Sequence, residues 1–330
     1  MSSLRVPFLR VSLRAAALTL AALMLATCAE RRAAVETVPA PTDAATTTSV
    51  APVAALTTTT VAAGPSAVFA DAAALAAELS VVEASIRVPD VPPIALADLG
   101  RRQQLAYRGV SQRPEWHAEL LASVQPVALG PLTFHLAARQ ALVDHAAGRP
   151  ATPPSATLPA WTIVEPLPVA ELRAYYDEAE AVTGVPWQYL AAIHFQETRM
   201  GRVVGQSSSG AVGPMQFLPS TWEQCCEGDP TVTRDAVLGA ARYLVLSGAP
   251  SDMQAALSAY NPNSGYVGAV TAYAQNMIAD ERAYFGYHGW EVFYGSSEGT
   301  VRLPVGYSQA APIDAAAYLR DHPSDLVVVA

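Results

Sequence analysis

The sequence predicts a mainly α-helical protein with one small β-hairpin near its C-terminal end. Apolar residues recur at helical spacing in segments between 67 and 147 and again from 161 to 277, and prolines and glycines punctuate these segments. The apolar period then changes to two in 290–294 and 301–303, on either side of a glycine-containing turn. Alternation of this kind around a turn is typical of a β-hairpin.

Composition limits the classes of protein to which the chain can belong. Its 330 residues are 51% hydrophobic and 15% charged, with a net charge of −9. This length allows one or two globular domains plus tails. A nucleic-acid-binding protein depends on Lys and Arg that contact phosphates, so the negative charge and the lack of a basic patch argue against that class.

The N-terminal residues 1–28 are expected to be a secretory signal. An apolar run, Ala15 to Ala26, follows three arginines and is too short for a confident membrane span. The run ends at Thr27-Cys28, which resembles a lipoprotein signal in which the cysteine receives lipid, although Gly, Ala or Ser is usual in place of Thr27. Lipidation of Cys28, an ordinary cleaved signal and an uncleaved anchor are the alternatives. All three place the protein in the cell envelope outside the cytoplasmic membrane, lipid-anchored or secreted.

Changes in composition divide the rest of the chain. Residues 29–66 are rich in Ala, Thr, Val and Pro, so they cannot bury a core and are expected to form a disordered linker. We expect a helical N-terminal region over 67–148 and a Pro-rich linker over 149–160. The clearest helical pattern, in 161–304, predicts the main domain, and 305–330 is expected to be a C-terminal tail.

Prolines, glycines and small polar residues predict helix ends within the main domain. Pro168 opens a helix that ends at Gly184, and Pro186 opens the next helix. Thr233 and Ser251 are expected to cap two further helices.

Glu197 stands near the end of the helix that Pro186 opens. At about 100° per residue it continues an apolar stripe formed by Trp187, Leu190, Ile193 and His194. Burial disfavours the charged form of a carboxylate and raises its pKa, and a carboxyl group that stays protonated near neutrality can protonate a glycosidic oxygen. The alternative is a helix-end glutamate paired with Arg199 or Arg202.

His194 precedes Glu197 by three residues, so a metal-binding pair has to be considered. No further partner of this kind is nearby, and the three cysteines and six histidines show no metal-ligand spacing. We therefore expect packing at the edge of the core for His194, and neither a metal nor a cofactor in the site.

A glycine-rich turn and a Met-Gln-Phe segment follow Glu197. Gly210 and Gly213 permit positive φ and close backbone approach. Gln216 would then present an amide donor and acceptor beside apolar surface, which suits a sugar with its hydroxyls and apolar ring face. The alternatives are a plain surface turn and a Met215–Phe217 pair that belongs to the core.

Together these motifs resemble the lytic transglycosylases, lysozyme-like enzymes that cut bacterial cell-wall glycan, and especially their membrane-bound B type with its Glu-Thr-Arg. The resemblance covers roughly 161–277, and in it Glu197 matches the catalytic acid. The positions that it implies for substrate binding are Ser207, Met215, Gln216, Phe217, Tyr260 and Asn261. Two positions depart from the commonest pattern: Thr198 replaces a serine, and Pro262 follows Asn261.

The resemblance implies a lysozyme-like (SLT-type) catalytic domain that acts, as a monomer, on peptidoglycan glycan strands. One glutamate would act first as acid and then as base, cleaving the β-1,4 bond between N-acetylmuramic acid and N-acetylglucosamine and leaving a 1,6-anhydro end. Ordinary glycosidases need two carboxylates. Asp229 and Asp235, the nearest later acids, fit a turn and a first helical turn better. A hydrolytic muramidase and a non-catalytic wall-binding or scaffold protein are the alternative functions.

Cys225 and Cys226 are adjacent in the sequence, which suggests a vicinal disulfide. Neighbouring Cα atoms are about 3.8 Å apart, shorter than the usual range for a disulfide. Two free thiols, or a pairing elsewhere, are therefore equally compatible with the sequence.

Overall fold

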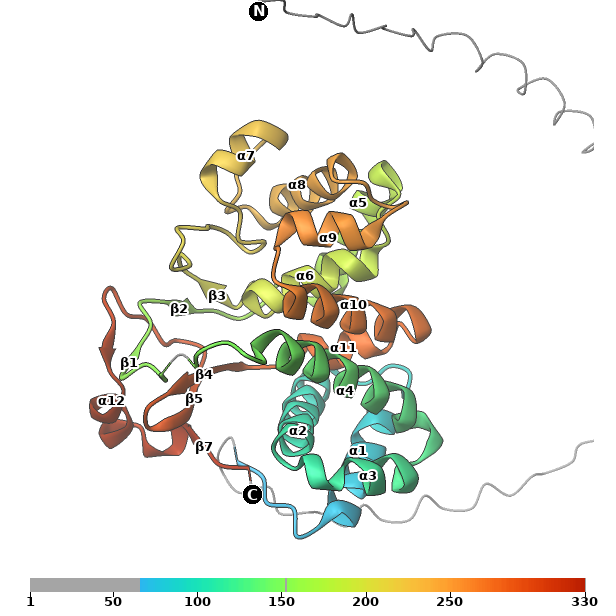
Figure 1. Cartoon of the computed structure of the whole chain (residues 1–330), viewed down its shortest axis with the longest axis vertical. Helices are drawn as coiled ribbons and strands as arrows, with labels where there is room; N and C mark the ends of the chain where they lie inside the picture. The colour runs from blue at the N-terminus through green and yellow to red at the C-terminus, as the bar shows by residue number, and fades with distance from the viewer. Residues whose placement is uncertain (1–65, 152, 330) are drawn as a thin grey trace, which may run out of the picture. The chain divides into compact units, whose positions relative to one another are not determined.

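The computed structural model describes residues 66–151 and 153–329, and most of these residues are in α-helices (Figure 1). The helices, in chain order, are α1 (Ala72–Ile86), α2 (Pro93–Gln112), α3 (His117–Ser123), α4 (Pro126–Ala146), α5 (Val169–Thr183), α6 (Trp187–Thr198), α7 (Pro219–Cys225), α8 (Thr233–Leu246), α9 (Met253–Tyr260), α10 (Ser264–Ala279), α11 (Ala283–His288) and α12 (Ala315–Asp321). The prediction of a mainly α protein is confirmed. The expected signal with Cys28, and the expected linker up to residue 65, lie outside the described residues.

Short antiparallel strands form three small sheets. Their pairs are β1 (Thr157–Leu158) with β6 (Ile313–Asp314), β2 (Thr162–Ile163) with β3 (Val203–Val204), and β5 (Gly299–Leu303) with both β4 (Val292–Ser296) and β7 (Leu326–Val327). The predicted hairpin is β4–β5, in which Val292 lies opposite Leu303. None of the helices in the described part of the chain has the length and apolar character needed to cross a membrane.

The C-terminal segment 305–330, expected to be a tail, is folded over most of its length. It supplies β6, α12 and β7, and its Tyr307 and Tyr318 are buried in a second hydrophobic cluster with β-strand residues such as Val301. Asp325 holds this segment to the hairpin: it accepts hydrogen bonds from Arg302 Nη2 at 2.8 Å and from Tyr318 Oη at 2.8 Å. Each element is too short to show a period in the sequence, which is why the tail prediction was wrong.

The two ends of the described fold meet beside this cluster. Ala67 N donates to Val328 O at 3.0 Å, and Val328 N donates to Ser66 Oγ at 3.1 Å. The first described residues of the chain therefore pair with the residue that follows β7, the last strand.

The helices of 67–148 belong to the main hydrophobic core. Leu75 and Leu79 of α1 and Leu132 of α4 lie in the same cluster of buried residues as the helices of 161–304. Helix α4 runs beside α10 (Figure 1) and comes very close to it, because a Cβ built on Gly268 would lie 2.4 Å from the Cβ of Ala141. The expected helical region and the expected main domain thus share one core.

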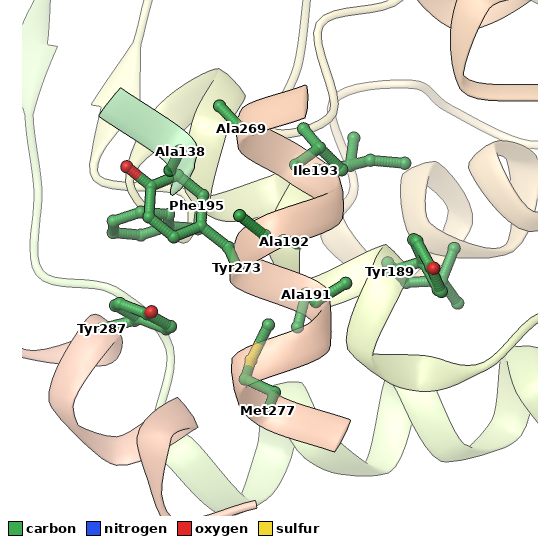
Figure 2. Packing of buried hydrophobic residues seen from close by; sticks show 14 of the residues in the cluster. Ala138, Tyr189, Ala191, Ala192, Ile193, Phe195, Ala269, Tyr273, Met277 and Tyr287 are labelled. Atoms are coloured by element: carbon green, nitrogen blue, oxygen red, sulfur yellow. The ribbon is translucent and has the colours of Figure 1, made fainter. Parts of the chain in front are cut away.

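Helix α6 lies at the centre of that core. Its small residues Ala191 and Ala192 let α10 approach closely, as Figure 2 shows. The ring of Phe195 packs against Tyr273 and Trp290, with centroids 5.1 and 5.2 Å away. The sequence predicted one buried stripe on this helix, whereas nine of its twelve residues are buried.

Proline and glycine residues predicted the helix ends more accurately than the small polar residues did. Gly184 caps α5 in the left-handed conformation with φ 73°, and Pro186 directly precedes α6. The predicted cap at Ser251 is wrong, because Asp252 caps α9 by accepting a bond from Ala255 N at 2.9 Å. Thr233 is the first residue of α8, and its side chain makes no capping bond.

We expect Gly268→Ala to destabilise the protein by about 1–3 kcal/mol, because the new methyl group overlaps Ala141 and pushes α4 away from α10. Gly130→Ala is the matched control, since Gly130 also lies in a helix but its Cβ would meet nothing within 4 Å. That control should be neutral or more stable by about 0.5–1 kcal/mol. Urea denaturation measures both free energies of unfolding, and equal effects of the two substitutions would contradict the close packing.

Candidate active site

Glu197 lies in the last turn of α6, where the chain turns back sharply. Arg199, Met200 and Gly201 follow it with φ of 54°, 60° and 85°, three successive left-handed residues. Left-handed backbone is uncommon at residues other than glycine and is kept only where the surrounding structure enforces it. The position of Glu197 is therefore set by contacts beyond its own helix.

Thr198 supplies one of these contacts. Its buried hydroxyl donates to Pro214 O at 2.6 Å and accepts from Gly201 N at 3.1 Å. One side chain thus joins the end of α6 to the turn after it and to the loop that carries Met215 and Gln216. The replacement of serine by threonine keeps the hydroxyl group that makes these bonds.

The glycine-rich loop is held by its own hydrogen bonds. Ser207 Oγ accepts from Ser209 N at 3.2 Å and from Ala211 N at 3.0 Å. Gly213 adopts φ 76°, and a Cβ on it would lie 1.8 Å from Pro230 O. Both the left-handed backbone and the close approach predicted from the glycines are present, and Gly213 cannot be replaced without moving the segment that contains Pro230.

Gln216 is half-buried and also left-handed, with φ 51°. Its Nε2 donates to Gly213 O at 2.9 Å and to Gly205 O at 3.3 Å, so the amide donor is used within the loop. No hydrogen bond from residues 66–151 or 153–329 reaches its Oε1, which leaves the acceptor end of the amide for a ligand.

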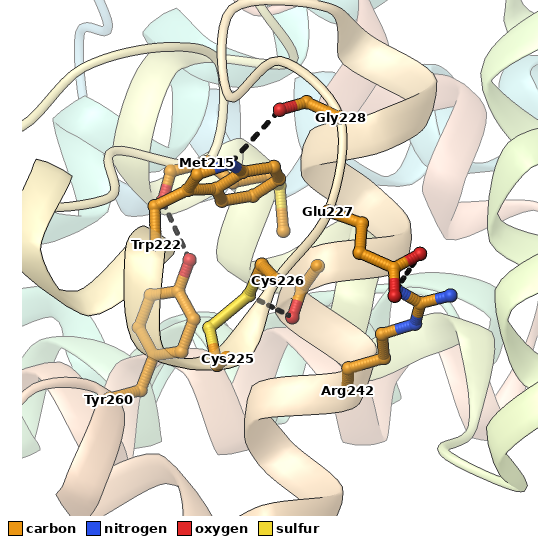
Figure 3. Close-up of a disulfide and its surroundings, with 9 residues drawn as sticks. Met215, Trp222, Cys225, Cys226, Glu227, Gly228, Arg242 and Tyr260 are labelled. Atoms are coloured by element: carbon orange, nitrogen blue, oxygen red, sulfur yellow. Dashed lines mark hydrogen bonds and ion pairs between the residues drawn. A yellow bond between two sulfur atoms is a disulfide. The ribbon is translucent and has the colours of Figure 1, made fainter.

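Met215 and Phe217 lie behind this loop. They are 0% and 4% exposed and belong to the main core, so neither side chain can contact a glycan directly in this conformation. Their contribution to the site is structural. Met215 O accepts a hydrogen bond from Tyr260 Oη at 2.6 Å, and the ring of Phe217 packs edge-on against that of Tyr260 at 5.6 Å (Figure 3 shows the Tyr260 bond).

Asn261 and Tyr266 connect α9 to α10 at the site. Asn261 Oδ1 accepts from Asn263 N at 3.1 Å, and Asn263 Oδ1 caps α10 by accepting from Tyr266 N at 3.1 Å. This relay fixes the first turn of α10, and with it the buried Tyr266. The Tyr266 hydroxyl has no partner at ordinary hydrogen-bond geometry among the described residues, and it lies beside Glu197.

Burial raises the pKa of Glu197 to about 7, and the neighbouring Tyr266 hydroxyl offsets only part of this rise. The pKa values of the Tyr260 and Tyr266 hydroxyls are also raised, by burial and by the nearby Glu197 carboxylate. Near neutral pH the site therefore holds a carboxyl group that readily gives up or takes a proton, beside two phenols that stay protonated.

Neither arginine near Glu197 in the sequence pairs with it. Arg199 lies over the ring of Phe195 at 4.6 Å and donates to Phe195 O at 2.6 Å. Arg202 pairs with Glu165 at 3.5 Å and donates to His288 O at 3.1 Å. A helix-end ion pair is thus not the role of Glu197.

The pKa of Glu197 is shifted by burial and by Tyr266, and by no other carboxylate of the described part of the chain. Asp229 accepts hydrogen bonds from Thr231 at 2.7 and 2.8 Å, and Asp235 accepts one from Asp229 N at 3.0 Å. Both acids are used in the turn before α8. Among the described residues, Glu197 is the carboxyl group of this site whose pKa is raised.

His194 is a core residue. It is fully buried, and its Nδ1 shares a hydrogen bond with Tyr176 Oη at 2.7 Å. Burial lowers its pKa to about 3, so the ring is neutral. Within 66–151 and 153–329 no group of three His, Cys, Asp or Glu side chains is placed to hold a metal ion.

Comparison with known proteins gives two relatives with the same name. Over 127 residues the chain is 30% identical to the membrane-bound lytic murein transglycosylase F of Thiobacillus denitrificans, an alignment that covers 36% of this chain and 27% of that protein. The chain is related to the lytic murein transglycosylases. The protein of the same name from Nitrosospira multiformis is 29% identical over 115 residues, or 32% of this chain and 24% of that protein.

The chain spans about a quarter of the length of these curated relatives. No family model matches the sequence, and no solved structure matches it significantly. The relation to the lytic transglycosylases and the mainly α fold agree with a lysozyme-like domain. The narrower resemblance to the B type stays a prediction.

Two residues of this site were not expected from the sequence. Tyr266 follows the Tyr260-Asn261 motif, and the cap that Asn263 forms on α10 holds it in place. Thr198 was noted as a departure, but its bond to Pro214 spans 16 residues and has no local signal. An Asn-x-x-Tyr spacing at a helix start is the one hint that could have indicated Tyr266.

Cys225 and Cys226, whose pairing the sequence left open, form a disulfide at the end of α7 (Figure 3). Cys226 Sγ also contacts Gly239 O at 3.5 Å, and Trp222 Nε1 donates to Gly228 O at 3.2 Å. The disulfide thus lies between the end of α7 and α8.

Glu197→Gln should change how stability depends on pH. With a pKa near 4.5 when unfolded and about 7 when folded, Glu197 keeps a proton in the folded protein that the unfolded chain loses between these pH values. The free energy of unfolding of the parent protein therefore falls as pH rises through this window, by up to about 3 kcal/mol. Glutamine cannot ionise, so the variant should gain stability relative to the parent from pH 4.5 to 7 and hold that gain above it. Urea denaturation at a series of pH values would contradict this if the two stability curves ran parallel.

Thr198→Val should loosen the end of α6, because valine keeps the shape of threonine but can neither donate to Pro214 O nor accept from Gly201 N. We expect a loss of about 1–3 kcal/mol in the free energy of unfolding. Greater access of water should also lower the pKa of Glu197, followed by NMR titration. Thr183→Val is the matched control, since Thr183 also bonds backbone groups at a helix end but lies on α5. A Glu197 pKa that moves equally in both variants would refute the positioning role of Thr198.

Proposed function

We propose that the chain is a peptidoglycan lytic transglycosylase that cleaves the β-1,4 bond between N-acetylmuramic acid and N-acetylglucosamine without water. The observation that carries this proposal is the half-buried Glu197, whose pKa of about 7 lets it serve both as acid and as base, with no second carboxylate among the described residues shifting that pKa. An inverting or double-displacement glycosidase would need that second group. The relation to the lytic murein transglycosylases points to the same reaction class.

The reaction follows from one carboxyl group. Protonated Glu197 donates its proton to the glycosidic oxygen as the bond between that oxygen and muramic acid C1 breaks. The Glu197 carboxylate then takes the proton of the C6 hydroxyl as O6 bonds to C1, which closes the 1,6-anhydro ring and restores the acid. The Tyr260 and Tyr266 phenols remain neutral, so they add no negative charge that would resist ionisation of Glu197.

We assign substrate contacts to the polar groups that stay accessible around Glu197. These are the acceptor end of Gln216, the half-buried Ser207 and the half-buried Asn261. Three residues support these groups from the core side: Tyr260, Met215 and Phe217. They do so through the Tyr260–Met215 hydrogen bond and the contact between the Phe217 and Tyr260 rings. The division gives the expected binding residues two roles, contact and support.

We also propose that the protein works in the cell envelope, on peptidoglycan strands, as a monomer without a cofactor. The charged and apolar leader before Cys28 supports export, and lipidation of Cys28 would attach the protein to a membrane. The related proteins are named as membrane-bound murein enzymes, which agrees with this location.

Glu197→Gln should abolish cleavage of purified sacculi, by at least a thousandfold or so, because the amide keeps the shape of the acid but cannot transfer a proton. Glycan binding should persist. Glu223→Gln, an exposed glutamate on α7, is the control and should cleave at the parent rate. Mass spectrometry of the products should show anhydro-muramyl ends.

The same experiment separates the alternatives. Reducing muramyl ends would indicate a hydrolytic muramidase. No cleavage by the parent protein, with glycan still bound, would indicate a binding or scaffold protein. Activity of Glu197→Gln within tenfold of the parent would remove Glu197 from the mechanism.

A further inference from the structure

A pocket of about 410 Å³ lies between the N-terminal helices and the end of α6. Three arginines from three different elements line it: Arg108 of α2, Arg139 of α4 and Arg199 after α6. We call it the arginine pocket. No Asp or Glu is among its described lining residues, although the whole protein carries a net charge of −9.

Most other arginines in the described part of the chain pair with a carboxylate, whereas these three have no carboxylate partner there. Arg87, Arg102 and Arg302, for example, each pair with an acid at 2.8 Å or less. Arg108 bonds only the Thr300 hydroxyl, and its Nε is buried without an acceptor. Arg199 bonds only a backbone carbonyl. Burial without a counter-charge lowers the pKa of both groups, so an anion entering the pocket would relieve this cost.

The other walls of the pocket add shape rather than charge. Tyr107 and Trp290 line it, and Tyr107 stacks on His135 with ring centroids 4.4 Å apart. Burial lowers the pKa of His135 to about 3, so that ring is neutral. Glu83, which accepts the Tyr107 hydroxyl proton in a hydrogen bond, is fully buried and already paired with Arg87. Glu83 therefore does not neutralise the positive charge of the arginine pocket.

The pocket lies a short distance from Glu197 along the same elements. Arg199 follows Glu197 by two residues, and Tyr273 of the pocket follows Tyr266 of the site by seven residues on α10. Seven residues of α-helix rise about 10.5 Å. An extended peptide covers about 3.3–3.6 Å per residue, so three residues span the same distance.

We propose that the arginine pocket binds the carboxylates of the peptide stem that muramic acid carries in peptidoglycan. This inference rests on the proposed function, which places a muramic acid at Glu197. The stem starts on that sugar and carries free carboxylates, and the amide side chain of Gln112, which can bond to a peptide, also lines the pocket. Arg108 and Arg139 belong to 67–148, so this region would supply substrate specificity to a site built by later helices.

Binding can be tested without any cleavage, by titration calorimetry of the whole protein with a synthetic stem tetrapeptide. Arg139→Gln is the main variant, because Arg139 is exposed and its loss should leave the fold intact. We expect it, and Arg108→Gln, to weaken peptide binding about tenfold or more each. Arg320→Gln is the control, since it removes the same charge from an exposed position on α12 and should change binding less than about twofold.

Two comparisons test the chemistry of the ligand. A tetrapeptide whose carboxylates are amidated should bind at least about tenfold more weakly than the free acid. Equal binding of the two peptides, or equal loss in Arg139→Gln and Arg320→Gln, would overturn the proposal. Inorganic phosphate that binds as tightly as the peptide would also overturn it, because the pocket would then be a general anion site.

Cleavage separates this inference from the proposed function. Arg139→Gln should raise KM on intact strands and leave the rate on strands stripped of peptide unchanged. A failure of cleavage by the parent protein would defeat the proposed function while the titrations still decide whether the peptide binds. Peptide binding that fails in a protein that cleaves normally would defeat only the arginine pocket.

Discussion

The structure depends on the burial of α6. A helix that is buried on almost every side can end only where its last turn is held by other parts of the chain, and here Thr198 and three left-handed residues provide that hold. The same burial removes water from Glu197 and raises its pKa. Stability and the raised pKa of Glu197 therefore come from one arrangement. The small residues Ala191 and Ala192, which let α10 approach, are as much part of the site as the acid itself.

Sequence reasoning worked where a signal is local. Pro186 and Gly184 mark helix ends through their own backbone preferences, so these ends could be predicted without tertiary information. The place of Glu197 on its helix could be predicted too, because it continues an apolar period. It failed where the deciding contact is distant. The roles of Met215 and Phe217 depend on whether a loop faces inward or outward, and the pairing of β5 with β7 joins segments that are each too short to show a period.

The helices of 67–148 form part of the structure that supports the site. In sequence they precede the lytic transglycosylase resemblance and could pass for a separate region. In the structure α4 lies against α10, and Gly268 leaves no room for a larger side chain between them. Since α10 carries Tyr266, any movement of α4 would reach the surroundings of Glu197. The two regions fold as one body, so the earlier helices can influence the chemistry without touching the acid.

The meeting of the chain ends at Ala67 and Val328 has a mechanical consequence. Any tension on the chain before residue 66 arrives first at this backbone pairing, which lies beside β7 and the second hydrophobic cluster. The load would be resisted there by the β4–β5–β7 sheet and by the Arg302–Asp325 contact, before it reached α1 and the helical core. A protein tethered at its N-terminal side could thus be pulled or swung without disturbing the geometry around α6.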